Sequence, residues 1–331
     1  RKRGKKDRDY SSDLDARFGH NADWPEGART IWVHAVSLGE LRSAVPLIRA
    51  VLARGERVVI THFTPAGRRE SLRVFAPEIA AGQIRVTWVP FEGDRYFTRF
   101  FNTFRPALGL VMEIEVWPQM IMSARKHRVP LFMCNAQYPS RSFERDLRNG
   151  AGLRARLMRG FSGAFVKSEL QYMRFAQTGL SPIEITGELR FDQPIPPAHL
   201  KAGQIARAAL APKRPVLALA SVVEGEDDTY IPALVQTLQG PDRPFYVYIP
   251  RAPERFDETY QRLVAAGLRV ARRSTVFDAD RALTDRPDSD ILLGDSLGEM
   301  YFYLALSDAA LVGGGFVTKG AHNVIEPLAL G

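Results

Sequence analysis

The stretch Ala309-Ala310-Leu311-Val312-Gly313-Gly314-Gly315, near the end of the chain, decides the fold that we expect. Its apolar first half predicts a buried strand, and its glycines predict a turn that is followed by polar residues and a helix start. Backbone N–H groups that stay free in a glycine turn and at a helix N-terminus bind phosphate groups. Glu326, one turn into that helix, suits ribose hydroxyls. The stretch predicts a nucleotide-sugar pocket, and it has neither the dinucleotide G-x-G-x-x-G pattern nor a Walker loop.

Apolar runs alternate with helical patterns along the whole chain. Segments such as 41–54 and 95–105 carry apolar residues at the three- and four-residue spacing of helices. Strand–helix alternation predicts parallel sheets that are covered on both faces, and therefore an α/β fold. The predicted strands are residues 31–35, 58–61, 84–89, 108–112, 131–134, 164–167 and 183–186, and then 216–220, 245–249, 269–271, 291–293 and 309–312.

A cluster of prolines at residues 193–197 interrupts this alternation, as a linker between domains would. We expect a basic N-terminal arm at 1–23, a Rossmann-like domain at 24–192, a linker at 193–203 and a second Rossmann-like domain at 204–331. The last residues read as the middle of a domain, so we expect the second domain to be truncated. Two such domains, with parallel sheets facing a central cleft, would bind ligands at the carboxyl ends of their strands.

Positive charge is concentrated at the start of the chain. The net charge is +8, and the first eight residues, with six basic groups and one acid, account for +5 of it. The folded body is therefore only weakly basic, which argues against nucleic-acid binding. The arm either contacts an anionic membrane surface or is simply solvated. Its basic residues are Arg1, Lys2, Arg3, Lys5, Lys6 and Arg8.

Acidic and polar side chains follow the predicted strands of the first domain. Glu40, expected at a strand's carboxyl edge facing the cleft, acts either as a general base or as an acid that stabilises a helix N-terminus. Position alone favours the second role. Glu113 and Glu115, beside Trp117, either bind substrate hydroxyls or form a structural pair. The other candidates for acceptor binding or for lining the cleft are Ser37, Arg42, Thr64 and Asn135, of which Thr64 also reads as a helix N-cap.

The second domain carries the candidates for donor binding. Arg251 follows a predicted strand and could pair with a phosphate, or else form an ion pair with Glu254 or Asp257. His322 and Glu326 have the spacing of metal ligands, but no third ligand matches them, so we predict no metal. The candidates for donor binding are Ser221, Glu224, Arg251, Gly313, Gly314, Gly315, Lys319, His322, Asn323 and Glu326.

In their order along the chain, several motifs resemble those of the 3-deoxy-D-manno-octulosonic acid (Kdo) transferases of lipopolysaccharide synthesis. The likeness runs from about residue 31 to the last residue. It rests on His34-Ala35-Val36-Ser37-Leu38-Gly39-Glu40, Glu113-Ile114-Glu115-Val116-Trp117-Pro118, Thr186-Gly187-Glu188-Leu189-Arg190-Phe191-Asp192, Pro253-Glu254-Arg255-Phe256, Gly294-Asp295-Ser296-Leu297-Gly298-Glu299, and the three glycines with His322-Asn323 and Glu326-Pro327.

The resemblance implies a GT-B fold, a CMP-Kdo donor, a lipid A precursor as acceptor, and an inverting transfer that needs neither a metal nor a cofactor. It also implies that Glu40 is the general base. That family usually carries an N-terminal membrane helix, which is absent from this chain. The basic arm would then be the cytoplasmic flank of such a helix, on the inner face of the bacterial inner membrane, where the protein is either peripheral or anchored.

Three motifs depart from the family pattern. Val222 and Val223 stand where the family commonly has Thr-His, Ala252 where it has His, and Gln137 where it has Arg. These changes remove hydrogen-bond donors that would face an acidic, phosphorylated substrate. Two other readings therefore stay open: a nucleotide-sugar epimerase or hydrolase of the same fold, and a non-catalytic paralogue that binds lipid or nucleotide sugar.

Overall fold

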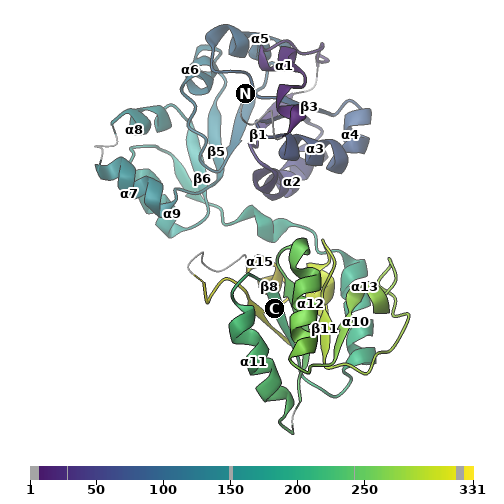
Figure 1. The fold of residues 1–331 in the computed structure, drawn as a ribbon. Helices are drawn as coiled ribbons and strands as arrows, with labels where there is room; N and C mark the ends of the chain where they lie inside the picture. Colours follow the sequence, from purple (N-terminus) through teal and green to yellow (C-terminus); the bar gives the residue numbers. More distant parts are fainter. Residues whose placement is uncertain (1–6, 28, 149–151, 242, 318–323) are drawn as a thin grey trace. The chain divides into compact units, whose positions relative to one another are not determined.

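The computed structural model describes residues 7–27, 29–148, 152–241, 243–317 and 324–331. The chain divides into two compact units, Arg1–Gln193 and Pro194–Gly331. Each unit is a parallel sheet with helices packed against it (Figure 1). The twelve predicted strands are all present, within two residues of their predicted bounds. None of the helices in these described ranges is long and apolar enough to cross a membrane.

The first unit contains a seven-stranded sheet in the order β3-β2-β1-β4-β5-β6-β7. Because β1 pairs in parallel with β2 on one side and with β4 on the other, the strand order reverses at β1 and β4. Ligands of doubly wound sheets bind at the carboxyl ends of the strands that flank such a reversal. The strands are β1 (Thr30–His34), β2 (Arg57–His62), β3 (Ile84–Trp88), β4 (Leu108–Met112), β5 (Leu131–Ala136), β6 (Gly163–Val166) and β7 (Ile183–Ile185).

Two apolar cores cover the two faces of this sheet. In β1, Trp32 packs into one core with the phenylalanines of α5, whereas Ile31 and Val33 pack into the other core with α2. This alternation follows from the two-residue period of a strand. The helices are α1 (Leu14–Arg17), α2 (Leu38–Ala53), α3 (Pro65–Val74), α4 (Ala76–Ala80), α5 (Asp94–Phe104), α6 (Pro118–Lys126), α7 (Ser140–Arg148), α8 (Gly152–Met158) and α9 (Glu169–Ala176), with 3-10 turns η1 (Arg8–Ser11) and η2 (Leu189–Asp192).

The segment before β1 packs against the first unit, so the basic arm is shorter than the predicted 1–23. Arg17 is only 2% exposed, and its guanidinium lies 4.1 Å from the centroid of the Trp88 ring. Arg69 on α3 forms ion pairs with Asp7 and Asp9 at 2.9 and 2.5 Å. The sequence pattern did not reveal this because the partners lie about sixty residues away along the chain.

The second unit contains a five-stranded sheet in the order β10-β11-β9-β8-β12. Here β8 pairs with β9 on one side and with β12 on the other, so the reversal lies between β8 and β12. Helices α10 and α14 pack on one face, and α11 and α12 on the other. The elements are β8 (Val216–Val222), β9 (Phe245–Pro250), β10 (Val270–Arg272), β11 (Ile291–Leu293), β12 (Ala309–Val312), α10 (Pro197–Leu210), α11 (Asp227–Leu238), η3 (Pro253–Arg255), α12 (Phe256–Ala265), α13 (Arg273–Val276), α14 (Met300–Ala305) and α15 (Ile325–Leu328).

Two predictions for this unit were wrong. Strand β12 was expected to be buried, but Ala309, Ala310 and Leu311 are exposed, the last at 41%. An apolar run records strand character but not sheet position, and β12 is the outermost strand of the described sheet. The predicted linker 193–203 was also too long, because α10 begins at Pro197. Proline is well tolerated at the first turn of a helix, so this cluster starts a helix as well as ending a unit.

Substitution of Gly203 tests how closely α10 packs on α14. A Cβ atom at this position would lie 2.6 Å from the carbonyl oxygen of Phe302 and 2.7 Å from Cβ of Ala305. We expect Gly203→Ala to destabilise the second unit by about 1–3 kcal/mol, because this clash outweighs the better helix propensity of alanine. Gly152→Ala on α8, where no atom of the described residues is found within 4 Å of the added Cβ, is the matched control and should be neutral or slightly stabilising.

Calorimetry on both variants measures the effect. All four tryptophans of the chain lie in the first unit, so tryptophan fluorescence should show that unit unchanged in Gly203→Ala. A variant as stable as the wild type would contradict the packing described for α10 and α14.

Candidate functional site

Glu40 lies in the first turn of helix α2, which follows the carboxyl end of β1. Ser37 is the N-cap, and its hydroxyl donates a hydrogen bond to Glu40 Oε1 at 2.8 Å while accepting one from the Glu40 N–H at 3.4 Å. The Val36 N–H donates to Glu40 Oε2 at 2.7 Å. This reciprocal pattern is a variant of the capping box, in which the Glu40 carboxylate accepts the N–H of the residue before the N-cap. The carboxylate is only 7% exposed, so Glu40 has the helix-stabilising role that position favoured and does not stand openly at the sheet edge as expected.

The same burial gives Glu40 the proton affinity of a base that works near neutral pH. Burial raises the pKa of Glu40 to about 7; hydrogen bonds from Ser37 and Val36 oppose the rise, and Glu115 and Glu113 add to it. A catalytic acid or base is most effective when its pKa lies near the working pH. The capping role and a role as base are therefore compatible in this one carboxylate.

Glu113 and Glu115 follow β4, across the strand reversal from Glu40. Glu113 has a left-handed backbone with φ of 56°, and its N–H donates to the Cys134 carbonyl at 2.9 Å. The Trp117 indole N–H donates to Glu115 at 2.6 Å. Burial is the main cause that raises the pKa of Glu115, and the Glu113 charge adds to it. The carboxyl groups that affect Glu40 are thus held at the strand ends next to it.

Lys167 was not among the predicted site residues. Its side chain links the loops that follow β4, β5 and β7. Its ammonium lies 2.9 Å from Glu188 Oε2, 3.0 Å from Gln137 Oε1 and 3.7 Å from Glu113 Oε1. The sequence hinted at it only by placing a lysine at the end of an apolar strand. Gln137, one of the departures from the family pattern, therefore accepts a hydrogen bond from this lysine.

Asn135 is part of the interior of the first unit. It is 1% exposed, its amide N–H donates to Glu188 at 2.9 Å, and its oxygen accepts the Leu189 N–H at 3.1 Å. Burial alone would raise the pKa of Glu188, but hydrogen bonds from Arg190, Lys167 and Asn135 outweigh it and hold the pKa at about 2. Asn135, which was predicted either to line the cleft or bind an acceptor or simply to form a turn, anchors the segment that follows β7.

The two remaining candidates of the first unit differ in accessibility. Thr64 caps α3: its hydroxyl accepts the Gly67 N–H at 3.4 Å and donates to the Val36 carbonyl at 3.0 Å. The folding role proposed for Thr64 is therefore confirmed. Arg42 is largely exposed and contacts Glu70 at 3.3 Å, so its guanidinium can reach a ligand at the surface.

In the second unit, Ser221, Glu224 and Arg251 lie at the carboxyl ends of β8 and β9. Ser221 has φ of 59° and marks a shift in the register between these strands. Glu224 and Arg251 are exposed. The predicted alternative partner Asp257 pairs with Arg272 at 2.6 Å instead. These three positions therefore remain accessible to a ligand.

In the glycine turn after β12, the N–H groups of Gly313, Gly314 and Phe316 have partners within the chain and are not free, as the sequence had predicted them to be. Glu226, at the end of the β8 turn, accepts hydrogen bonds from Gly314 N–H at 2.7 Å and from Phe316 N–H at 3.3 Å. A carboxylate of the chain itself thus lies where a phosphate was expected. Glu326 is half-buried in α15, and Lys319, His322 and Asn323 fall outside the described residues.

Two acids of the motif at residues 294–299, Asp295 and Glu299, are held by arginines, whereas Leu297 between them is 71% exposed. Glu299 is paired with Arg273 at 2.6 and 2.8 Å and with Arg281 at 3.3 Å. Burial would raise the pKa of Glu299, but hydrogen bonds from Arg273 and Ser296 hold it below its usual value. Asp295 accepts from Arg272 at 2.7 Å. These acids brace α13 and the start of α14.

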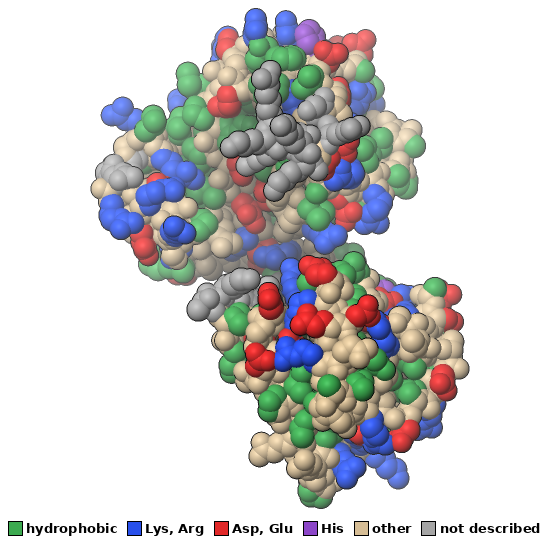
Figure 2. Space-filling view, in the orientation of Figure 1, with side chains coloured by type: hydrophobic (Ala, Val, Ile, Leu, Met, Phe, Trp, Pro, Cys, Tyr) green, Lys and Arg blue, Asp and Glu red, His purple; other side chains and the backbone are tan. Residues whose placement is uncertain are grey.

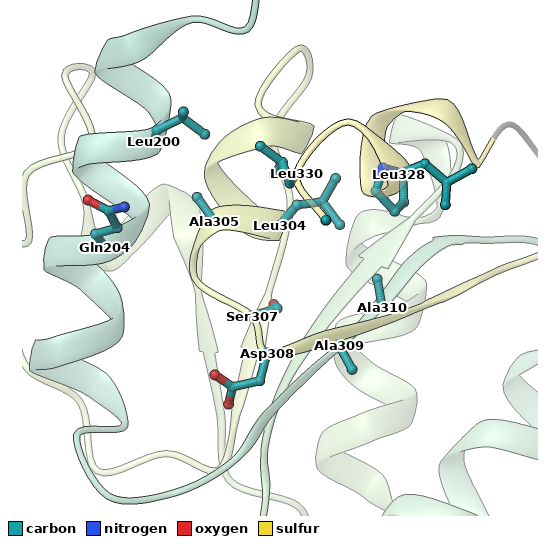
Figure 3. Close-up of a pocket in the computed structure, with 12 residues that line it drawn as sticks. Leu200, Gln204, Leu304, Ala305, Ser307, Asp308, Ala309, Ala310, Leu328 and Leu330 are labelled. Atoms are coloured by element: carbon teal, nitrogen blue, oxygen red, sulfur yellow. The ribbon is translucent and has the colours of Figure 1, made fainter. Parts of the chain in front are cut away.

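A surface pocket of about 460 Å³ lies between α10, α14, α15 and the start of β12 (Figure 3). Its walls include Leu200, Leu304 and Leu328, with Asp308 at one side, and none of the predicted site residues lines it. We therefore do not assign the reaction to it. In the parts of the chain that the structure describes, no group of three or more His, Cys, Asp or Glu side chains is arranged to hold a metal ion.

Comparison with known proteins identifies the family. A family model described as 3-deoxy-D-manno-octulosonic-acid transferase (kdotransferase) matches residues 12–193, more than half of the chain. A 3-deoxy-D-manno-octulosonic acid transferase of Bordetella pertussis is 41% identical over 323 residues, which are 96% of this chain and 73% of that protein. One of Haemophilus influenzae is 29% identical over 97% of this chain and 73% of that protein.

A solved glycosyltransferase of Rickettsia africae ESF-5 aligns with a TM-score of 0.52 at 9% identity, over 92% of this chain and 78% of that chain. At this identity the likeness bears on the fold alone, which is of the GT-B class, with two Rossmann-like units. The resemblance inferred from the motifs is confirmed by the family model and by the 41% identity. The chain belongs to the 3-deoxy-D-manno-octulosonic acid transferase family.

Proposed function

We propose that this glycosyltransferase moves a Kdo residue from CMP-Kdo to a lipid A precursor in lipopolysaccharide synthesis, with inversion and without a metal or cofactor. Family membership supports the transfer of Kdo. The single observation that supports the chemistry is Glu40, a buried carboxylate at the strand reversal of the first unit with a pKa of about 7. Such a group is deprotonated often enough to act as a base and basic enough to take a proton.

In the proposed reaction Glu40 takes the proton of an acceptor sugar hydroxyl. The hydroxyl oxygen forms a bond to the anomeric carbon of Kdo from the face opposite CMP. The bond between that carbon and the phosphate oxygen breaks, and CMP leaves with the electron pair. One bond forms as one breaks, so the anomeric configuration inverts.

The donor would be held by the exposed groups of the second unit. Arg251 has an exposed guanidinium, which can pair with the phosphate and offset the charge that develops on it as CMP leaves. We assign Glu326 to the ribose and Lys319 to the phosphate. The further donor contacts that we propose are Ser221, Glu224, Gly315, His322 and Asn323. Gly313 and Gly314 are proposed to shape the turn, and Ser37, Arg42, Glu113 and Glu115 to contact the acceptor.

The acceptor carries lipid, so we also propose that the protein works at the cytoplasmic face of the inner membrane. The six basic residues of the arm would contact its anionic lipids. The first unit offers a second basic surface at α7 and α8, where Arg141, Arg148 and Arg156 are exposed together with Leu147 and Leu153. Figure 2 shows Lys and Arg side chains gathered over this end of the first unit. Arginines with exposed leucines suit an anionic lipid surface.

Glu40→Gln tests the base. Glutamine can still complete a capping box, so α2 should form normally. We expect kcat for Kdo transfer to fall by roughly 10²–10⁴ while the KM for CMP-Kdo stays within a few-fold, because the amide cannot take a proton. Glu78→Gln, which neutralises a carboxylate on α4 that pairs with Arg49 of α2, is the matched control and should keep kcat near that of the wild type.

The assay uses CMP-Kdo with and without tetraacylated lipid A precursor. Near-normal transfer by folded Glu40→Gln would remove Glu40 from this role. Donor hydrolysis that does not depend on acceptor would favour the hydrolase reading, and donor binding without turnover would favour the non-catalytic paralogue.

The raised pKa of Glu40 also predicts how stability depends on pH. The folded state binds this proton more tightly than the unfolded state, whose pKa is near 4.5. The stabilising contribution of Glu40 is therefore fully present below pH 4.5 and is lost as the pH rises through 7. Relative to Glu40→Gln, the wild type should lose up to about 3 kcal/mol across that window. Urea unfolding followed by tryptophan fluorescence measures the free energy of unfolding at each pH. If this free energy depends on pH in the same way in both proteins, the raised pKa of Glu40 is contradicted.

Vesicle binding tests the membrane contact of the arm. Replacing its six basic residues with alanine should weaken binding to phosphatidylglycerol-rich vesicles by up to about 1 kcal/mol per residue. Added salt should weaken binding of the wild type more than that of the variant, since salt screens exposed charges. Neutral phosphatidylcholine vesicles serve as the control. Equal binding of both proteins to the anionic vesicles would show that the arm does not contact the membrane.

A further inference from the structure

Glu226 is a fully buried carboxylate between two turns of the second unit. It lies immediately before α11 and has 0% exposure. Its Oε2 accepts the Val223 N–H at 3.0 Å, and its Oε1 accepts the N–H groups of Gly314 and Phe316 at 2.7 and 3.3 Å. The turn after β8 and the turn after β12 are therefore joined through one side chain.

In the described part of the chain no Lys, Arg or His side chain pairs with Glu226. The neighbouring Asp227, in contrast, is paired with Arg255 and accepts a hydrogen bond from the Tyr248 hydroxyl at 2.6 Å. Among the described residues, the Glu226 carboxyl group is thus contacted by backbone N–H groups alone, as in the concave N–H sites that bind anions. Hydrogen bonds to an ionised acceptor are roughly twice as strong as neutral ones.

The glycines of the β12 turn are explained by this carboxylate. A Cβ atom at Gly313 would lie 2.4 Å from the Ser221 carbonyl oxygen and 2.8 Å from Glu226 Oε2. Gly314 has φ of 90°, a conformation that side chains rarely adopt. Glycine is therefore required at both positions for the backbone to reach Glu226, whether or not a ligand is bound.

We propose that Glu226 is a positioning residue for the nucleotide-sugar donor. It acts as an internal anion that fastens the β12 turn to the β8 turn, and so fixes Ser221, Glu224 and Gly315 relative to one another. The donor phosphate is then bound by groups other than the Gly314 N–H, with Arg251 the exposed cation at the adjoining strand end. The part that concerns the donor rests on the proposed function, whereas the fastening of the two turns does not.

The experiment compares Glu226→Ala and Glu226→Gln with Asp228→Ala in the full chain. Asp228 is an exposed acid in the first turn of α11 and controls for the loss of a nearby charge. Amide hydrogen exchange of residues 313–317 reports on the turn, and calorimetric titration with CMP reports on the nucleotide site. We expect Glu226→Ala to accelerate exchange there and to weaken CMP binding, each by about tenfold or more, which equals about 1.4 kcal/mol. Glu226→Gln should be intermediate, and Asp228→Ala unchanged.

Added formate distinguishes positioning from a general loss of structure. Formate can occupy the space left in Glu226→Ala and accept the same N–H groups, so it should slow exchange at residues 313–317 and restore part of the CMP affinity. Chloride at the same ionic strength should not.

Unchanged exchange in Glu226→Ala would overturn the inference. Fast exchange throughout the second unit that formate does not reverse would also overturn it. If Glu226→Ala fails to fold, Glu226→Gln replaces it in the test, and exchange in that variant equal to that of the wild type would overturn the inference. A wild type that binds no CMP while exchange responds as expected would count against the proposed donor alone.

Discussion

In each unit a buried carboxylate accepts a hydrogen bond from a backbone N–H just beyond the first strand of the sheet. Glu40 accepts from Val36 after β1, and Glu226 accepts from Val223 after β8. Both strands lie where the strand order reverses, which leaves room at their carboxyl ends for a ligand. The turn at each reversal has orphan N–H groups that must be satisfied if it is to stay folded away from water. A carboxylate of the chain satisfies them, and this holds each candidate site in shape.

The two carboxylates differ in what surrounds them. Glu40 lies among further acids, and its buried position raises its pKa to about 7, so it can exchange a proton at physiological pH. Glu226 receives N–H groups from a second turn, about ninety residues further along the chain. One arrangement favours proton transfer, and the other favours a fixed backbone. The same interaction thus suits the chemical role proposed for Glu40 in the first unit and the geometric role proposed for Glu226 in the second.

The strands could be predicted from the sequence because apolar periodicity records burial and local conformation directly, as for residues 108–112 and 291–293. Sheet position could not, since β12 has the composition of a buried strand but is the outermost strand of the sheet in the described part of the chain. Glu40 and Glu113 could be selected because each follows a strand. The contacts of Lys167, Glu188 and Glu226 could not be predicted, because their partners come from loops distant in sequence. The prediction of free N–H groups in the glycine turn was wrong for the same reason. The sequence shows the donors but not the acceptor that reaches them.

The capping box at Glu40 has a consequence for motion. A carboxyl that has just accepted a proton is a poorer hydrogen-bond acceptor than a carboxylate, and one of its oxygens now carries a hydrogen that has to find its own acceptor. With Glu40 as the base, the bonds to Val36 and Ser37 would therefore weaken at the moment of transfer and strengthen again when the proton departs. The first turn of α2 would therefore loosen and tighten once for each sugar transferred, so that fraying at this helix end would occur once per turnover.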